Sequence, residues 1–334
     1  MKFRAFRNLL RQDLGFGLLL LACAMLILAL LNPYVRLQRY TFDDLVVVDI
    51  TQSMNTLDYH QANKPVSRLV FVKGALQRAL LRLPCGSKIG LGIFTEYRSF
   101  VLFEPAEVCA NYREISTTLA GIDNRMAWVG ASEIAKGLYS GLRTVRSLPG
   151  HPALVFITDG QEAPPINPLH RPVFDGKPGE AKGVIIGAGG FVPMPIPKFA
   201  PDGKPLGYWR ADEVLQIDPY SLGRGGSVEG EKMVETDKAP QISLGATPGS
   251  EQLSSLREPY LRLLAKETGM DYRRLGSFSD LTAALEDHEL AQQQDAPVGI
   301  AWIPALLALF CLLGMYGIPI GYRTTPNHST SVSG

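Results

Sequence analysis

The chain has 334 residues, and its 33 Lys and Arg residues nearly balance its 32 Asp and Glu residues, which leaves a formal net charge of +1. This balance excludes a protein built mainly to bind nucleic acid, because that task needs a concentrated positive field. A hydrophobic fraction of 46% with 19% charged residues also excludes a disordered chain. Two charge-free stretches lie near the ends of the chain, so the middle is expected to form a water-soluble domain.

The first charge-free stretch predicts a membrane-spanning helix over residues 14–35. No charged residue occurs between Asp13 and Arg36, and about 20 apolar residues suffice to cross a bilayer as a helix. Ala22-Cys23-Ala24 is followed by seven more apolar residues. This length disfavours a cleavable signal peptide, whose apolar core is normally about 7–15 residues long. Leu20-Leu21-Ala22-Cys23 resembles a lipoprotein cleavage motif only weakly. An uncleaved anchor is therefore favoured over a signal peptide and over a lipoprotein.

The second stretch predicts another spanning helix over residues 297–322, because no charge occurs between Asp295 and Arg323. A buried hairpin of the soluble domain is the alternative, and the length of the charge-free run disfavours it. Basic residues near a membrane mark the cytoplasmic side, and four of them lie in segment 1–13. We therefore expect segment 1–13 and the tail 323–334 in the cytoplasm. The domain over residues 38–290 is then expected in the periplasm, anchored in a bacterial inner membrane.

Between the two spans, buried strand patterns alternate with helical ones. This alternation predicts a doubly wound, mostly parallel α/β sheet with helices on both faces. In such sheets ligands bind at the carboxyl ends of the strands. Residues 191–250 interrupt the pattern with many prolines and glycines, and we expect an irregular insertion there. The expected strands are 45–50, 89–94, 99–103, 153–158, 183–188 and 271–275, and the expected helices are 67–83, 134–145, 260–268 and 279–293.

Hydroxyl and carboxylate side chains follow the expected strands. Asp49, Thr51 and Ser53 come at the end of the first strand, and Asp159 follows the strand 153–158. Ser132 directly precedes an expected helix and adds a third hydroxyl. Oxygen donors of this type suit Mg²⁺ or another hard divalent cation such as Mn²⁺ or Ca²⁺. The alternative is that these side chains only cap a helix or satisfy loop amides.

Here the sequence resembles the von Willebrand factor A (vWA) family. Its stretch from Val47 to Met54 resembles the opening Asp-x-Ser-x-Ser of the family's metal-ion-dependent adhesion site (MIDAS), with Thr51 in place of the first Ser. The stretch Ser67 to Lys73 resembles the family's first helix, and Ile157 to Gly160 resembles its fourth strand and final metal-site Asp. The resemblance implies that five residues hold the metal, some through water. These are Asp49, Thr51, Ser53, Ser132 (where the family usually has Thr) and Asp159.

The order of anchor, vWA domain and anchor is similar to bacterial vWA proteins that accompany MoxR-type AAA+ ATPases. Among these it resembles vWA proteins encoded with methanol-dehydrogenase maturation factors. The resemblance implies binding of a protein partner that offers a carboxylate to the metal. It also implies a MoxR-type ATPase and other vWA proteins as associates. The implied role is assembly or maturation of a periplasmic or membrane complex, with metal insertion into a dehydrogenase as one form of it.

Two rival functions are weighed against this one. The first is a structural membrane scaffold with a non-functional metal site. It differs from the binding module only in that its site binds neither a metal nor a partner. A phosphotransfer enzyme that uses Asp49 as nucleophile lacks a general acid, because such hydrolases carry a second Asp where this chain has Thr51. The chain also contains no phosphate-binding loop, dinucleotide fingerprint, nucleophile elbow or zinc-protease motif. We therefore expect no enzymatic activity, no catalytic residue and no organic cofactor.

Cys85 and Cys109 fall in the domain expected on the oxidising side, where a disulfide is stable. Cys85 precedes a strand and Cys109 follows one. Such turns normally lie on opposite rims of a doubly wound sheet, which counts against contact. A loop that folds back over an edge would allow a bridge, and closing it would stabilise the fold by about 3 kcal/mol. Bridged and free thiols therefore both remain open.

Overall fold

The computed structural model describes residues 2–127, 130–166, 171–217 and 249–317. The chain forms two compact units. Unit 1 comprises residues 1–37 and 295–334, and unit 2 comprises Gln38–Gln294. Trp128 and most of the expected insertion, over residues 218–248, lie outside the described residues.

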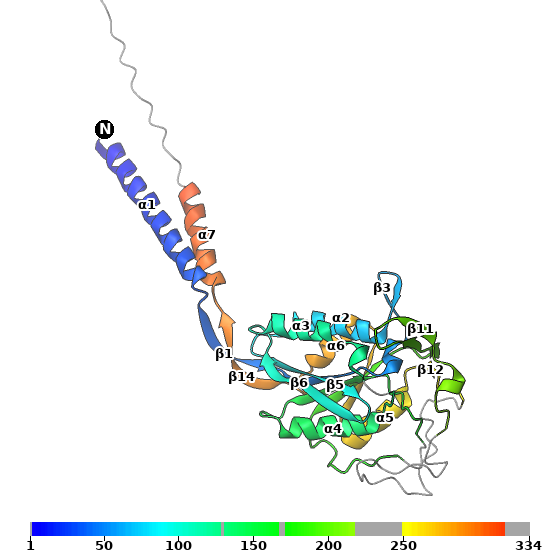
Figure 1. Cartoon of the computed structure of the whole chain (residues 1–334). Helices are drawn as coiled ribbons and strands as arrows, with labels where there is room; N and C mark the ends of the chain where they lie inside the picture. The colour runs from blue at the N-terminus through cyan, green and yellow to red at the C-terminus, as the bar shows by residue number, and fades with distance from the viewer. Residues whose placement is uncertain (1, 128–129, 167–170, 218–248, 318–334) are drawn as a thin grey trace, which may run out of the picture. The chain divides into compact units, whose positions relative to one another are not determined.

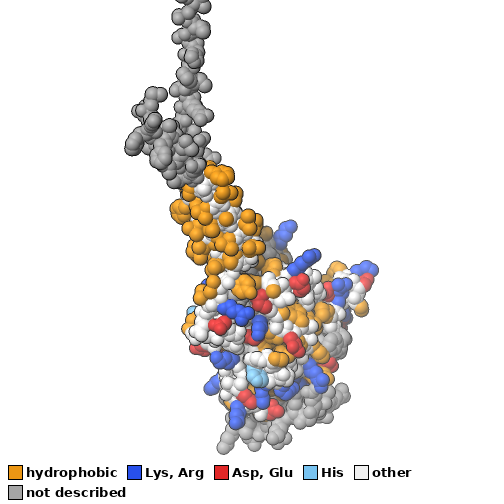
Figure 2. All heavy atoms as spheres, turned by 90° about the vertical axis from the view of Figure 1, so that its left-hand side faces the viewer, with side chains coloured by type: hydrophobic (Ala, Val, Ile, Leu, Met, Phe, Trp, Pro, Cys, Tyr) orange, Lys and Arg blue, Asp and Glu red, His pale blue; other side chains and the backbone are white. Residues whose placement is uncertain are grey.

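Unit 1 is built around two helices that lie side by side (Figure 1), α1 over Lys2–Leu30 and α7 over Trp302–Gly317. The small side chains of Ala22 and Ala308 are buried, each about 1% exposed. Large apolar side chains of both helices are exposed, such as Ile27 and Phe310 at 61% and 65%. Figure 2 shows hydrophobic atoms covering this part of the molecule. Among the described residues, no helix is long and apolar enough to cross a membrane.

The helices of unit 1 have different bounds from the predicted spans 14–35 and 297–322. Helix α1 ends at Leu30, and the strand β1 (Tyr34–Thr41) begins four residues later. The strand β14 (Gln292–Gly299) precedes α7, and the two strands form a small sheet of their own. A charge-free run does not mark where a helix ends, because strand and helix both accept apolar residues. Residues 318–322 lie outside the described residues.

Unit 2 contains a six-stranded sheet with the strand order β13-β8-β7-β2-β5-β6. Five strands are parallel, and β6 at one edge runs antiparallel to β5. The two central strands, β2 and β7, are fully buried, because they are covered on both faces. The strands are β2 (Asp43–Asp49), β5 (Lys88–Thr95), β6 (Arg98–Glu107), β7 (Ala153–Thr158), β8 (Gly183–Ala188) and β13 (Asp271–Leu275).

Helices cover both faces of this sheet (Figure 1). The helices α2, α3 and α6 pack on one face, against alternate β2 residues such as Val46 and Val48. The helices α4 and α5 pack on the other face, against Leu45 and Val47. The expected doubly wound α/β fold, with a mostly parallel sheet, is therefore confirmed. The helices are α2 (Arg68–Leu80), α3 (Tyr112–Gly121), α4 (Ile134–Ser147), α5 (Glu258–Thr268) and α6 (Phe278–Leu285), with single turns η1 (Gln52–Asn55), η2 (Asn124–Met126) and η3 (Ala211–Glu213).

Two elements differ from the sequence prediction. Helix α6 ends at Leu285, so the predicted helix 279–293 is wrong beyond that residue. Two short turns follow, and residues 292 and 293 belong to β14. The helix α3 was not among the expected elements. Its only buried side chains are Ile115 and Leu119, so the apolar pattern that marks it in the sequence is short.

The described part of the insertion contains short strands rather than irregular chain alone. The strand β9 pairs antiparallel with β12, and β10 pairs antiparallel with β11. Another hairpin, β3 with β4, lies between η1 and α2. The bounds are β3 (Tyr59–Gln61), β4 (Lys64–Val66), β9 (Met194–Pro195), β10 (Pro197–Phe199), β11 (Pro205–Tyr208) and β12 (Leu253–Ser254).

Candidate metal site

The two predicted metal-site carboxylates lie at the ends of neighbouring strands. Strands β2 and β7 are parallel, and Val48 pairs with Ile157. Asp49 is therefore the last residue of β2 and Asp159 follows the end of β7 at the same edge of the sheet. Both side chains are fully buried. Gly160, which follows, has a φ of +79°, and a Cβ there would lie 2.9 Å from Leu261 Cγ, so this turn requires glycine.

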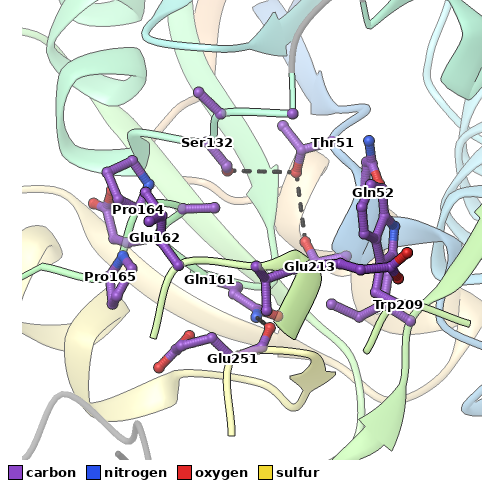
Figure 3. A pocket seen from close by; sticks show the side chains of 17 residues that line it. Thr51, Gln52, Ser132, Gln161, Glu162, Pro164, Pro165, Trp209, Glu213 and Glu251 are labelled. Atoms are coloured by element: carbon purple, nitrogen blue, oxygen red, sulfur yellow. Dashed lines mark hydrogen bonds between the residues drawn. The ribbon is translucent and has the colours of Figure 1, made fainter. Parts of the chain in front are cut away.

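Hydroxyl groups surround the Asp49 carboxylate. Thr51 donates to Asp49 Oδ1 from its backbone nitrogen at 2.8 Å and from its hydroxyl at 2.6 Å. Thr158 Oγ1 donates to Asp49 Oδ2 at 2.6 Å. The Thr51 hydroxyl lies 3.4 Å from both Ser53 Oγ and Ser132 Oγ. Figure 3 marks the contact between Thr51 and Ser132 with a dashed line. The structure thus brings four of the five predicted residues into one connected group.

Ser132 reaches this group from a distant part of the chain. Its backbone nitrogen donates to the Ala163 carbonyl at 2.6 Å, and the Ala163 nitrogen donates back at 2.8 Å. The next residue, Glu133, donates to the carbonyl of Glu96, which follows β5. Ser132 is thereby held between the loops that follow β5 and β7, and its side chain is 3% exposed.

Asp159, the fifth predicted residue, is bonded differently. Its Oδ1 accepts a hydrogen bond from the Gln161 backbone at 2.9 Å. Its Oδ2 accepts from Arg68 Nη1 at 2.5 Å and from Ser254 Oγ at 3.3 Å. No hydrogen bond between Asp159 and the hydroxyl group around Thr51 occurs among the described residues. Asp159 therefore lies beside the group and is fixed by other partners.

Arg68 is the functional residue that the sequence analysis missed. Its fully buried guanidinium also pairs with Asp58 at 2.7 Å and donates to Ser254 Oγ at 2.6 Å. Burial alone would lower the pKa of Arg68, but the charges of Asp159 and Asp58 outweigh it and raise the pKa. Arg68 begins α2, where the Ser67 hydroxyl accepts from the Val70 nitrogen and caps the helix. Nothing in the sequence marks this arginine as buried.

The charges of the site favour a divalent cation. With Asp49 ionised, three buried carboxylates (Asp49, Asp58 and Asp159) face one buried guanidinium, which leaves a net charge of −2. Burial and then the charge of Asp159 raise the pKa of Asp49 to about 7, against hydrogen bonds from Thr158 and Thr51. A bound cation would favour the ionised carboxylate. Hard oxygen donors and this charge fit Mg²⁺ or a similar ion, held by Asp49, Thr51, Ser53 and Ser132.

A pocket of about 280 Å³ opens on the three predicted hydroxyl residues, Thr51, Ser53 and Ser132. Figure 3 shows it from close by. One wall is the loop after β7, over residues 161–165, and another comes from the insertion, with Trp209 and Glu213 among its residues. We call this cavity the metal-site pocket. The buried carboxyl of Glu162 belongs to its lining, and burial raises its pKa to about 7 despite hydrogen bonds from Tyr260 and the Ala135 backbone.

Cys85 and Cys109 form a disulfide, with sulfurs 1.99 Å apart. The expectation that they lie on opposite rims of the sheet is wrong. Because β6 runs antiparallel to β5, the end of β6 returns to the rim where β5 begins, and Lys88 pairs with Glu107. Glu107 accepts from the Gly86 and Ala110 nitrogens at 2.7 and 2.6 Å and holds the two loops together. The described free cysteines are Cys23 and Cys311.

No family model matches this chain, and no curated protein matches its sequence. The chain is similar to an aerotolerance-related membrane protein of Bacteroides fragilis, at 17% identity over 73% of this chain and 96% of that chain, with a TM-score of 0.46. It is similar to a membrane-spanning protein of Vibrio fischeri at 18% identity over 72% and 93%, with a TM-score of 0.27. Proximal thread matrix protein 1 of the mussel byssus, solved with a zinc-occupied MIDAS motif, matches at 15% identity over 46% and 39%, with a TM-score of 0.29.

Unit 2 places Asp49 and Asp159 at the ends of neighbouring parallel strands, where the sequence resemblance expects them.

Proposed function

We propose that unit 2 is a binding module that captures a carboxylate of a partner protein through a divalent cation. The observation that carries this proposal is the hydrogen-bonded group of Asp49, Thr51, Ser53 and Ser132, whose hydroxyls open on the metal-site pocket. Asp49, Thr51, Ser53 and Ser132 would hold the ion, and Asp159 would add its charge from beside them. When bound, the ion supplies a positive charge that prefers an anionic oxygen as its next ligand. Mg²⁺ is the proposed ion, with Mn²⁺ or Ca²⁺ as alternatives.

The site residues have separate tasks in this proposal. The Thr51 and Thr158 hydroxyls orient the Asp49 carboxylate through both of its oxygens. Arg68 holds Asp159 and prevents it from rotating towards the pocket. The bonds between Ser132 and Ala163 fix the third hydroxyl at the pocket. None of these residues needs to move or to transfer a proton, so we propose no enzymatic role.

We further propose that α1 and α7 anchor the module in a bacterial inner membrane, with unit 2 in the periplasm and both termini in the cytoplasm. The exposed apolar side chains of both helices and the charge-free runs 14–35 and 297–322 support this. Reporter fusions at residue 230 and at residue 334 are expected to signal from opposite compartments. Signals from one compartment would contradict the topology.

The nature of the partner rests on the sequence resemblance alone. A MoxR-type AAA+ ATPase, other vWA proteins and a client complex that needs maturation are proposed associates. One form of this proposed maturation is the insertion of a metal into a dehydrogenase. Co-purification of the full chain from membranes, with and without a chelator, tests whether any associate depends on the metal.

One substitution tests the capture function directly. Asp49→Ala in the full chain is expected to abolish both Mn²⁺ binding by calorimetry and metal-dependent retention of the partner. Asp271→Ala is the matched control, because this carboxylate is 58% exposed and lies at the start of β13, at the edge of the sheet opposite the site. Capture that survives Asp49→Ala would exclude the proposed mechanism.

A structural membrane scaffold with a dead metal site is the second candidate. One observation favours it: both Asp159 oxygens already accept hydrogen bonds, and one of them pairs with Arg68. Under this function the chain would bind no Mn²⁺, and Asp49→Ala would leave every association unchanged. The calorimetric titration therefore separates the two candidates.

A further inference from the structure

The insertion builds an apolar wall on the metal-site pocket. Its residues are Ile196, Trp209, Val214 and Leu215. In Figure 3, Trp209 lies across the pocket from Pro164 and Pro165, which belong to the loop after β7. Leu215 is 59% exposed, so the wall continues from the pocket to the surface. The volume of about 280 Å³ is close to the lower limit of about 300 Å³ for small-ligand pockets. The pocket is therefore sized for one or two side chains rather than for a broad protein surface.

The wall is fixed to the metal site by hydrogen bonds. Strand β9 pairs with β12, and Ser254 of β12 bonds both Arg68 and Asp159. The backbone nitrogen of Trp209 donates a hydrogen bond to the Ile196 carbonyl at 3.0 Å. Lys198 Nζ lies 4.4 Å from the centre of the Trp209 ring. A wall held in this way needs little reordering when a ligand binds, which favours affinity.

Two polar atoms of the pocket-lining side chains are buried without a hydrogen-bond partner in the protein. Gln161 donates from Nε2 to the carbonyls of Glu251 and Leu253, so its Oε1 remains an acceptor without a donor. Trp209 Nε1 is a donor without an acceptor. Both atoms are fully buried, so a ligand in the pocket does not reach them.

The charges of the lining restrict what kind of ligand the pocket accepts. Its acidic residues are already bonded within the protein: Glu213 to Lys198 at 2.7 Å, and Glu251 to Arg257 at 3.7 Å. Glu162 accepts from the Ala135 backbone and from Tyr260. Among the described lining residues there is no Lys or Arg. A carboxylate ligand would therefore find its positive charge only on the metal.

We infer that the metal-site pocket selects a short segment of a partner protein in which an acidic residue is followed by a large apolar one. The inference rests on the proposed function. The acidic side chain meets the cation above Thr51 and Ser132. The apolar side chain packs on the wall of Leu215 and Val214.

The test uses the purified full chain, Mn²⁺ and three short probes measured by calorimetric titration. The probes are acetyl-Asp-Leu-amide, acetyl-Asp-Ser-amide and acetyl-Asn-Leu-amide. The Asp-Leu probe is expected to bind about tenfold more tightly than the Asp-Ser probe, a ratio that corresponds to about 1.4 kcal/mol. The Asn-Leu probe is expected not to bind, because it lacks the carboxylate.

One variant and one control locate the selectivity. Leu215→Ser should remove the preference for Leu over Ser while Mn²⁺ binding is retained. Leu206→Ser should keep the preference, because Leu206 is equally exposed at 59% but does not line the pocket.

The outcomes separate this inference from the proposed function. If the chain binds no Mn²⁺, the proposed function fails and the inference fails with it. If Mn²⁺ binds but the two Asp probes bind equally, or neither binds, the inference is overturned and the metal site stands. Equal effects of Leu215→Ser and Leu206→Ser would also overturn it.

Discussion

Arg68 and Asp159 form an ion pair in which both side chains are wholly buried, with Nη1 2.5 Å from Oδ2. The pair joins the first helix of unit 2 to the loop after its central strand β7. The same guanidinium contacts Asp58 and Ser254, so one charge holds four segments at the carboxyl edge of the sheet. The site is thereby fixed without a cation, and a cation adds to a framework that already exists.

Removal of this guanidinium should be costly. Arg68→Met leaves the buried carboxylates of Asp58 and Asp159 without the positive charge that pairs with them, and we expect the free energy of unfolding to fall by about 3–5 kcal/mol. Chemical denaturation measures this. Arg262→Met is the control, because Arg262 is 61% exposed in its pair with Glu258, and such pairs contribute about 0–1 kcal/mol.

A second variant keeps this prediction testable if Arg68→Met folds poorly. The double variant Arg68→Met/Asp159→Asn should be more stable than Arg68→Met alone, because it removes one of the unpaired charges. An equal or lower stability of the double variant would contradict the role assigned to the pair.

Metal binding should depend on Asp49. Mg²⁺ or Mn²⁺ should raise the melting temperature of the wild-type chain, and a free concentration of 100 times Kd corresponds to about 2.7 kcal/mol. Asp49→Asn should show no such rise. Without metal at pH 8, Asp49→Asn should be more stable than the wild type, since it removes one of two neighbouring buried charges. A metal-dependent rise that persists in the variant would place the ion elsewhere.

Asp44 should make stability depend on pH. It is fully buried, neither oxygen has a partner in the described protein, and burial followed by the charge of Asp43 raises its pKa well above 3.8. The folded chain keeps this proton at pH values where the unfolded chain has lost it. Stability therefore falls as the pH rises from about 4 through the folded-state pKa.

Asp44→Asn should remove this dependence. We expect it to stabilise the chain by about 1–3 kcal/mol at pH 8 and to have little effect near pH 3. Denaturation at several pH values measures both. Asp212→Asn, at an exposed carboxylate, should stay within about 0.5 kcal/mol of the wild type throughout. Parallel pH profiles for Asp44→Asn and the wild type would show that Asp44 is not the group responsible.

The disulfide between Cys85 and Cys109 determines how many thiols of the unreduced chain can react. In denaturant without reductant, two of the four cysteines should react with a thiol reagent, Cys23 and Cys311. All four should react after reduction, and reduction should lower the stability of unit 2 by about 3 kcal/mol. A variant with Ser at positions 23 and 311 should show no reactive thiol before reduction. Four reactive thiols in the unreduced wild type would contradict the bridge.

Much of the central sheet could be predicted from the sequence because its strands are apolar on both faces. The runs at 153–158 and 183–188 coincide with β7 and β8. The strand predicted at 271–275 coincides with β13, although its residues are mostly polar, as suits an edge strand. The direction of β6 could not be predicted, because an edge strand has the same local pattern whichever way it runs. Because the direction of β6 was not known, Cys85 and Cys109 were expected on opposite rims of the sheet, whereas they lie on the same rim.

The site was predictable where its residues are consecutive or follow a strand, as Asp49, Thr51, Ser53 and Asp159 do. Arg68 was not, because its helix shows ordinary apolar spacing and its partners come from distant segments. A buried carboxylate requires a compensating group, but the sequence does not say which one. Trp209 belongs to the insertion, and only the fold places it at the pocket.

The chain enters and leaves unit 2 at neighbouring points, where Thr41 Oγ1 donates to the Gln292 carbonyl at 3.4 Å and Gln293 Nε2 donates to Tyr40 at 3.2 Å. Unit 2 is thus a cassette inserted between two helices, with its ends already joined by hydrogen bonds. If unit 2 were removed, the two flanking segments of the chain could be joined across a short distance. This connectivity would allow unit 2 to be deleted, which leaves two helices joined by a short turn. It would also allow unit 2 to be replaced by an unrelated domain at the same two points.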